Sequence, residues 1–162
     1  MADTRETCRT NIGNLLQREL ELTTQLQPLL ADEYRSIVER DTTCFEQLIA
    51  DKAGLLERLS GLEQERATIQ ENAGFAAGHA GMEDCLCWCD PRQQLVPHWQ
   101  ALQAHAAVCH RLNRKNQQLA ELCSRHVREA LHLLRGEELR QDTYLADGET
   151  DHRHSSRSIA RA

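Results

Sequence analysis

Residues 95–134 read LVPHWQALQAHAAVCHRLNRKNQQLAELCSRHVREALHLL and contain the longest unbroken periodic pattern of the chain. Core-type positions recur there in alternating steps of four and three, and we call them the seam: Leu95, Trp99, Leu102, Ala106, Cys109, Asn113, Asn116, Ala120, Cys123, Val127, Ala130 and Leu134. This spacing is typical of a helix that packs against other helices. It predicts one long helix, from about residue 92 to Arg135, and favours a helical interaction protein over an enzyme.

Two further periodic segments precede the seam. The first stripe consists of Ile12, Leu15, Leu16, Leu22, Leu26, Leu29, Leu30, Tyr34, Ile37 and Val38. The second stripe consists of Phe45, Leu48, Ile49, Lys52, Leu55, Leu56, Leu59, Leu62, Arg66 and Ile69. A cap residue followed three positions later by Glu or Gln precedes each of the three periodic segments, at Asp3–Glu6, Thr43–Glu46 and Asp90–Gln93. Such capping boxes mark helix starts, so the sequence predicts three main helices.

The connections define the expected architecture. The first stripe slips by one position beside Pro28, which predicts a kink or a split of that helix. Residues 74–89 contain three glycines and no useful helical stripe, which predicts a loop. Short connections favour antiparallel neighbours, so we expect an all-α, elongated bundle of three long helices, or of four if the first breaks at Pro28. The bundle should span residues 1–136, and the polar residues 137–162 should form a flexible tail.

Composition narrows the class of protein. With 162 residues the chain is expected to form a single domain. A net charge of −6 argues against nucleic acid as a partner, because phosphate binding needs clustered Lys and Arg. No stretch approaches the roughly 20 apolar residues of a membrane span, and the start lacks the apolar region of a signal peptide. We therefore expect a cytoplasmic protein without a membrane span.

The chain contains seven cysteines, three of which alternate in the predicted loop as Cys85, Cys87 and Cys89. Thiolates favour soft metals, but structural zinc sites usually separate paired cysteines by two to four residues. The alternating spacing therefore favours no metal, and packing of the loop on the bundle explains the cysteines as well. The histidines form no known nucleophile motif, so we predict no catalytic residues and no cofactor.

Polar residues at stripe positions have two readings each. Lys52 and Arg66 either cover apolar surface while their charged heads reach water or a carboxylate on the first helix, or control helix register. Asn113 and Asn116 are either a buried hydrogen-bonded pair that fixes register, or a section of the seam that the protein's own helices do not fill. In the second case, amides beside Leu112 and Leu119 would suit a partner helix.

The arrangement resembles the flagellar export chaperone FlgN family. The matching segments are residues 30–41, LADEYRSIVERD, residues 48–59, LIADKAGLLERL, then Arg66, residues 113–116, NRKN, and residues 144–148, YLADG. The order and spacing of these segments carry the resemblance, which covers most of residues 10–148. In the family a glycine follows the tail tyrosine, whereas Leu145 stands there in this chain.

The resemblance implies an α-helical, non-enzymatic chaperone. Its implied partners are hook-associated proteins 1 and 3, whose C-terminal helices it would bind, and the flagellar export gate and export ATPase complex, to which it would deliver them. The implied substrate-binding residues are Leu112, Asn113, Asn116, Leu119 and Cys123. The implied residues for docking on the export gate are Tyr144, Asp147 and Gly148. Two alternatives stay open, a metal- or redox-responsive helical sensor built on Cys85, Cys87 and Cys89, and a self-associating coiled-coil scaffold.

Overall fold

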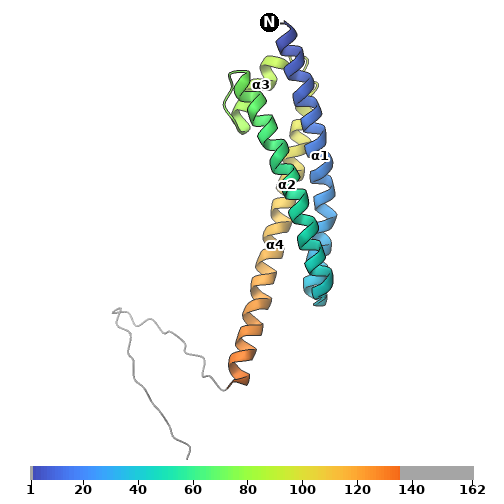
Figure 1. Ribbon diagram of the computed structural model, residues 1–162, viewed down its shortest axis with the longest axis vertical. Coiled ribbons are helices and arrows are strands. Elements are labelled where there is room, and N and C mark those ends of the chain that lie inside the picture. The colour runs from blue at the N-terminus through green and yellow to red at the C-terminus, as the bar shows by residue number, and fades with distance from the viewer. Residues whose placement is uncertain (1, 136–162) are drawn as a thin grey trace, which may run out of the picture. The chain divides into compact units, whose positions relative to one another are not determined.

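The computed structural model describes residues 2–135, and all regular secondary structure in that range is helical. The helices are α1 (Ala2–Glu39), α2 (Thr42–Asn72), α3 (His79–Cys89) and α4 (Val96–Leu134) (Figure 1). The prediction of an all-α fold with three long helices is confirmed. Within the described range, no helix has the length and apolar character needed to cross a membrane.

The chain divides into two compact units, residues 1–123 and residues 124–162. The first unit contains α1, α2, α3 and most of α4. Of the second unit, the structure describes the last turns of α4 and Arg135. Residues 137–162, which the sequence predicts to be a flexible tail, lie outside the described residues.

Helices α1 and α2 form an antiparallel hairpin, and α4 runs parallel to α1. Ion pairs join Glu19 to Arg66 and Glu33 to Lys52, so residue numbers rise along α1 as they fall along α2. Along α1 and α4, residue numbers rise together. Cys109 donates a hydrogen bond to the Thr23 carbonyl, and Asn116 donates one to the Leu30 carbonyl. The expected up-down-up order of the long helices is therefore confirmed.

Of the two alternatives predicted at Pro28, a kink or a split, the split does not occur, because α1 is one helix through this residue. Proline in a helix interior costs about 3 kcal/mol. Leu26 and Leu30, on either side of it, are both buried in a cluster with Cys109. Each buried leucine contributes about 1.5–3 kcal/mol, so packing outweighs the cost of the proline.

The loop predicted over residues 74–89 is wrong for its second part, since His79–Cys89 forms α3. One face of this short helix is buried and consists of Met82, Cys85, Leu86 and Cys89, at helical spacing. Its glycines serve the turn before it. Gly78 adopts a φ of 94°, and a Cβ on Gly81 would lie 1.8 Å from the Ala76 carbonyl oxygen. These glycines allow the chain to enter α3 and do not prevent a helix.

The start of α2 differs from the predicted capping box at Thr43. The cap is Asp41, whose carboxylate accepts a hydrogen bond from the Cys44 backbone N–H at 3.0 Å. Arg40 reverses the chain just before it, with a φ of 60°. Because α2 already begins at Thr42, Thr43 lies inside the helix and cannot be its cap.

The other two predicted boxes are also displaced. Helix α1 begins at Ala2, ahead of Asp3, whose side chain lies outside the described residues. Before α4, Asp90 Oδ2 accepts a hydrogen bond from the Leu95 backbone N–H at 2.6 Å. Gln93, with a φ of 54°, belongs to an extra turn that delays the helix to Val96. Asp90 therefore stabilises the start of α4 across a longer turn than a capping box spans.

The buried apolar residues are concentrated where α3 packs against the first unit's other helices. The largest cluster consists of Cys8, Ile12, Leu16, Met82, Cys85, Leu86, Cys89, Trp99 and Leu102. Along α2 the first buried residue is Leu62, and no residue from Thr42 to Gly61 is buried. The apolar core is therefore unevenly distributed along the hairpin.

Candidate functional site

The two seam asparagines have different environments. Asn116 is buried, and its Nδ2 donates to the Leu30 carbonyl at 2.7 Å and to Glu33 Oε2 at 2.9 Å. Asn113 is exposed, and its Oδ1 accepts from Lys52 Nζ at 3.4 Å. They are not a buried pair. The interpretation as a buried hydrogen-bonded pair is therefore wrong, and of the two asparagines only Asn116 bonds to α1.

A polar network surrounds Asn116. Lys52 Nζ lies 2.5 Å from Glu33 Oε1, and the Glu33 side chain is almost fully buried. The network joins α1, α2 and α4 in one place, through Glu33, Lys52 and Asn116. Lys52 reaches a carboxylate on α1, as one of the two sequence readings predicted. Asn116 Oδ1 is buried without a hydrogen-bond partner, so the network is incomplete.

Arg66 is the second charged residue at a stripe position and is buried. Its Nε lies 3.1 Å from Glu19 Oε2, and its guanidinium lies over the Trp99 ring at 5.1 Å. Burial raises the pKa of the Glu19 carboxyl, although the Arg66 charge opposes this shift. Arg66, like Lys52, therefore reaches a carboxylate on α1, as the first of its two interpretations predicted.

The remaining candidate substrate-binding residues are progressively less covered along α4. Leu112 is half-buried and packs against the cluster of Leu26, Leu30 and Cys109. Leu119 is half-buried, and Cys123 is exposed. The structure places all of these residues on α4.

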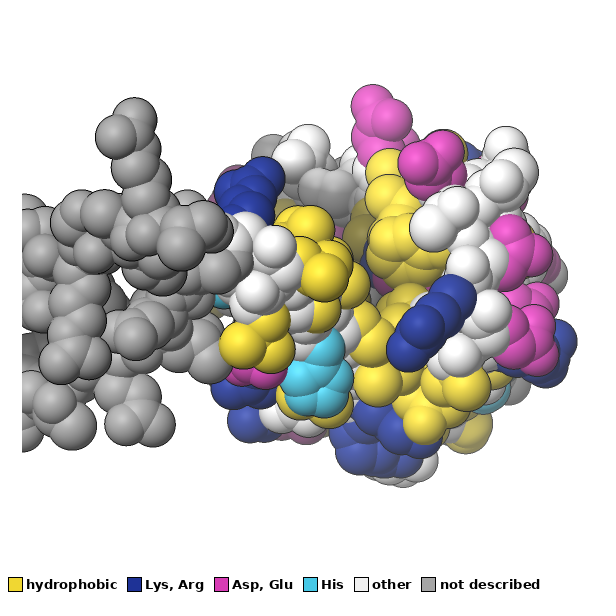
Figure 2. Space-filling view, turned by 90° about the horizontal axis from the view of Figure 1, so that it is seen from below, with side chains coloured by type: hydrophobic (Ala, Val, Ile, Leu, Met, Phe, Trp, Pro, Cys, Tyr) yellow, Lys and Arg dark blue, Asp and Glu magenta, His cyan; other side chains and the backbone are white. Residues whose placement is uncertain are grey.

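The seam is covered over only part of its length. Ala106 is exposed, and every residue from Glu121 to Arg135 is exposed. Large hydrophobic residues are among them: Leu122, Val127, Leu131, Leu133 and Leu134. We call residues 121–134 the exposed segment of α4. Figure 2 shows hydrophobic side chains open to solvent beside charged ones. The seam predicts a helix that packs against partner helices, and in this segment the protein's own helices do not cover it.

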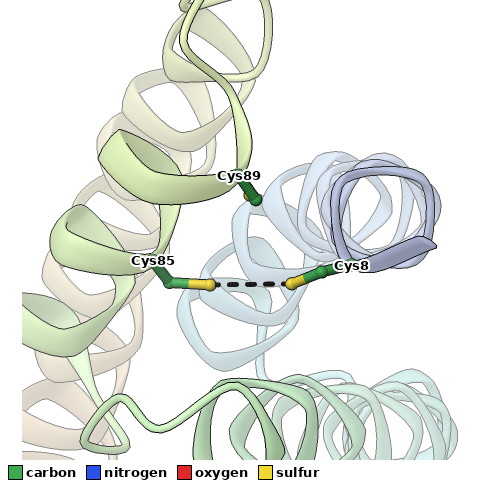
Figure 3. A group of neighbouring side chains, drawn as sticks. All are labelled: Cys8, Cys85 and Cys89. Atoms are coloured by element: carbon green, nitrogen blue, oxygen red, sulfur yellow. Dashed lines mark hydrogen bonds between the residues drawn. The ribbon is translucent and has the colours of Figure 1, made fainter. Parts of the chain in front are cut away.

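Three cysteines meet at the contact between α1 and α3 (Figure 3). The sulfur atoms of Cys8, Cys85 and Cys89 all lie within 4.8 Å of one another, and all three residues are buried. Cys8 Sγ is 3.8 Å from Cys85 Sγ. Cys87 is exposed and takes no part. The predicted grouping of Cys85, Cys87 and Cys89 assumed an extended backbone, whereas in a helix Cys87 faces away from the other two.

The cysteine cluster changes the acidity of its members. Burial raises the pKa of the Cys8 thiol. Hydrogen bonding to Cys89, followed by burial, raises the pKa of the Cys85 thiol, while hydrogen bonding to Cys85 lowers that of Cys89 to about 7. Sequence reasoning missed Cys8 because it lies 77 positions from Cys85. Only the packing of α1 on α3 could reveal this contact.

The described histidines that face other helices bond to amide side chains. His105 Nδ1 lies 2.7 Å from Gln27 Nε2, and His79 Nε2 lies 2.5 Å from Gln103 Nε2. The proposed docking residues Tyr144, Asp147 and Gly148 lie outside the described residues.

Comparison with known proteins gives one finding. A protein-family model described as FlgN protein matches residues 9–152, which is most of the chain. No curated protein matches the chain, and no solved structure matches it.

Proposed function

Because the chain belongs to the FlgN family, a family of flagellar export chaperones, we propose which proteins it binds and with which surface. It binds the C-terminal helical regions of hook-associated proteins 1 and 3 in the cytoplasm. Binding keeps these substrates unassembled until they reach the flagellar export apparatus.

One observation carries the proposed binding surface, namely the exposed segment of α4. The seam continues there through Cys123, Val127, Ala130 and Leu134, while every residue from Glu121 to Arg135 is exposed. A continuous apolar stripe on a helix is the usual means by which a protein pairs with an amphipathic partner helix. A substrate whose helices otherwise join a filament would present such a stripe.

The size of this surface suits reversible binding. Burying a large apolar side chain contributes roughly 1.5–3 kcal/mol. Three of the large exposed residues, Val127, Leu131 and Leu134, share the seam face of the exposed segment, whereas Leu122 and Leu133 lie on another side of the helix. Association costs roughly 4–15 kcal/mol in lost freedom of motion. The gain, about 5–9 kcal/mol at most, is comparable to this cost, so binding through the stripe is weak enough for the substrate to be released.

The candidate residues outside the exposed segment have distinct proposed roles. Leu112 and Leu119 are half-buried and extend the apolar stripe toward the covered part of α4. Asn113 is exposed and offers an amide that can both donate to and accept from a substrate helix. Asn116 already donates a hydrogen bond to the Leu30 carbonyl of α1, so its proposed role is to position α4.

The test is a binding titration of the full chain with synthetic C-terminal helical segments of hook-associated proteins 1 and 3. Val127→Glu places a charge in the apolar stripe and should weaken binding at least tenfold. Gln118→Glu adds the same charge at an exposed position on the opposite side of α4 and should leave the affinity unchanged. Circular dichroism verifies that both variants keep their helical content. Equal binding by both variants would remove the exposed segment as the proposed surface.

For the tail, we propose docking on the export gate and the export ATPase complex through Tyr144, Asp147 and Gly148. The support is the resemblance of residues 144–148 to the family's tail segment. A pulldown with the full chain and with a chain ending at Gly136 separates the two activities. The shortened chain should retain hook-associated proteins and lose the export-gate protein. Loss of both, or of neither, would contradict separate docking.

A further inference from the structure

The cysteine cluster has the composition of a metal site. Cys85 and Cys89 are four residues apart on α3 and therefore share one face of that helix. Cys8 on α1 faces them across the helix contact (Figure 3). In the sequence, the spacing of alternate cysteines argued against a zinc site. In the structure, the two α3 ligands are Cys85 and Cys89, which are separated by one helical turn and can face the same ion.

We propose that Cys8, Cys85 and Cys89 bind one thiophilic d10 metal ion, Zn²⁺ or Cu⁺, through three thiolates. Zinc–sulfur bonds are about 2.3 Å long, so two sulfurs on one tetrahedral zinc lie about 3.8 Å apart. Cys8 Sγ and Cys85 Sγ are separated by 3.8 Å, and all three sulfurs lie within 4.8 Å of one another. Only small side-chain movements are needed to reach a common ion. On binding, each thiol releases its proton to solvent.

The surroundings suit a cluster that carries negative charge. Arg9 brings a positive charge to the same surface as Cys89 and Asp90, although its guanidinium is also paired with Glu6 at 2.6 Å. Cys89 and Asp90 also line a surface pocket together with Arg5, Arg9 and Trp88. Through this pocket an ion can approach Cys89, one of the three ligands, from solvent, and a metal site needs such an entry path.

Asp90 can distinguish between the two candidate ions. Its Oδ1 is buried without a hydrogen-bond partner, and it follows Cys89 directly in the chain. Structural zinc takes four ligands, whereas Cu⁺ is satisfied by soft sulfur ligands alone. Zinc therefore needs a fourth ligand, and the Asp90 carboxylate, which is not within 4.8 Å of all three sulfurs, must move to provide it; Cu⁺ needs no fourth ligand.

The competing explanation is that these cysteines are small apolar residues that fill the contact between α1 and α3. Under this explanation Cys8→Ala would keep the packing, and added metal would bind no better than to a variant without the cluster. If the cluster binds a metal ion, binding instead requires the sulfur atoms of Cys8, Cys85 and Cys89 and does not require the exposed cysteines.

The experiment titrates the reduced full-length protein with Zn²⁺ and with Cu⁺ in competition with a chelator of known affinity. One equivalent of one ion should bind, and Cys8→Ala and Cys85→Ala should each lose about 100-fold or more in affinity, since even changes around a ligand cost 10–100-fold. Cys87→Ala is the matched control on α3 and should bind as the unaltered protein does. Added metal should raise the thermal unfolding midpoint of the unaltered protein and of Cys87→Ala. It should not raise the midpoint of Cys8→Ala or Cys85→Ala.

Asp90→Asn completes the design, because it should weaken Zn²⁺ binding and leave Cu⁺ binding unchanged. Circular dichroism without metal verifies that the alanine variants remain helical. The proposal is overturned if neither ion binds stoichiometrically, if Cys8→Ala binds as well as Cys87→Ala, or if mass spectrometry of the air-exposed protein finds Cys8 and Cys85 joined as a disulfide that added metal does not prevent.

Discussion

The two parts of α4 carry the same periodic pattern but differ in burial. Between Leu95 and Asn116 the seam contributes Trp99, Leu102 and Cys109 to the buried core. From Glu121 onward every described residue of the same helix is exposed. A heptad pattern therefore shows that a helix face is suited to packing, but it does not show which helix will pack on it.

The length of α1 explains where burial stops. Asn116 bonds to Leu30 and Glu33, and α1 ends at Glu39. Parallel helices advance together by about 1.5 Å per residue, so α1 extends only six to nine residues past the level of Asn116. This is where the exposed segment begins.

The largest expected effect tests what holds the covered part of α4. Arg66→Ala should lower the free energy of unfolding by about 3–5 kcal/mol, because it leaves the buried Glu19 carboxylate without its ion partner. It also removes the guanidinium from the Trp99 ring of α4. Urea unfolding followed by circular dichroism measures the change.

The control for Arg66 is the neighbouring pair of Arg18 and Glu65, which is exposed on both sides and 3.6 Å apart. Arg18→Ala should cost less than about 1 kcal/mol. Similar losses in the two variants would mean that burial does not distinguish these pairs.

The second prediction compares one substitution in both parts of α4. Leu102→Ala removes a buried side chain and should cost about 2–3 kcal/mol, the lower part of the usual range, because Leu102 retains 8% of its surface. Leu131→Ala should change stability by less than about 0.5 kcal/mol, since Leu131 is 45% exposed. Urea midpoints of the two variants should separate clearly. If they coincide, the two parts of α4 are equally covered in solution.

Much of the fold could be predicted because it depends on long periodic segments. The three stripes identified α1, α2 and α4. The short helix α3 was missed although Met82, Cys85, Leu86 and Cys89 have helical spacing, because Gly78 and Gly81 suggest a loop when read alone. Sequence left a kink and a split open at Pro28, because it cannot weigh a local cost against the burial of Leu26 and Leu30, and only the split is excluded.

The site was less predictable than the fold. Asn113 and Asn116 look equivalent in sequence, but only Asn116 faces α1. The grouping of Cys8 with Cys85 and Cys89 depends on a contact between helices that no local pattern encodes. The end of α1 sets the limit of seam burial, and this limit follows from the register of two helices, not from the residues of α4.

The third prediction tests the register role of Asn116. Asn116→Ala should cost about 1–3 kcal/mol, since it leaves the buried Glu33 carboxylate with one partner fewer. Asn113→Ala should be close to neutral because Asn113 is exposed. Thermal unfolding of the pair measures the difference. Equal values would show that Asn116 does not align α4 with α1.

The smallest expected effect is a slight gain in the free energy of unfolding, whereas the other predicted variants lose stability. Val127 is 59% exposed in the exposed segment, so Val127→Ala loses little buried surface and gains up to about 0.6 kcal/mol from the better helix propensity of alanine. The free energy of unfolding should therefore stay the same or rise slightly, whereas Leu102→Ala lowers it. Urea unfolding at two protein concentrations measures this. A loss above about 1 kcal/mol that grows with concentration would mean that a second copy covers Val127, and the self-associating scaffold would then replace the substrate-binding surface as the better account of the seam.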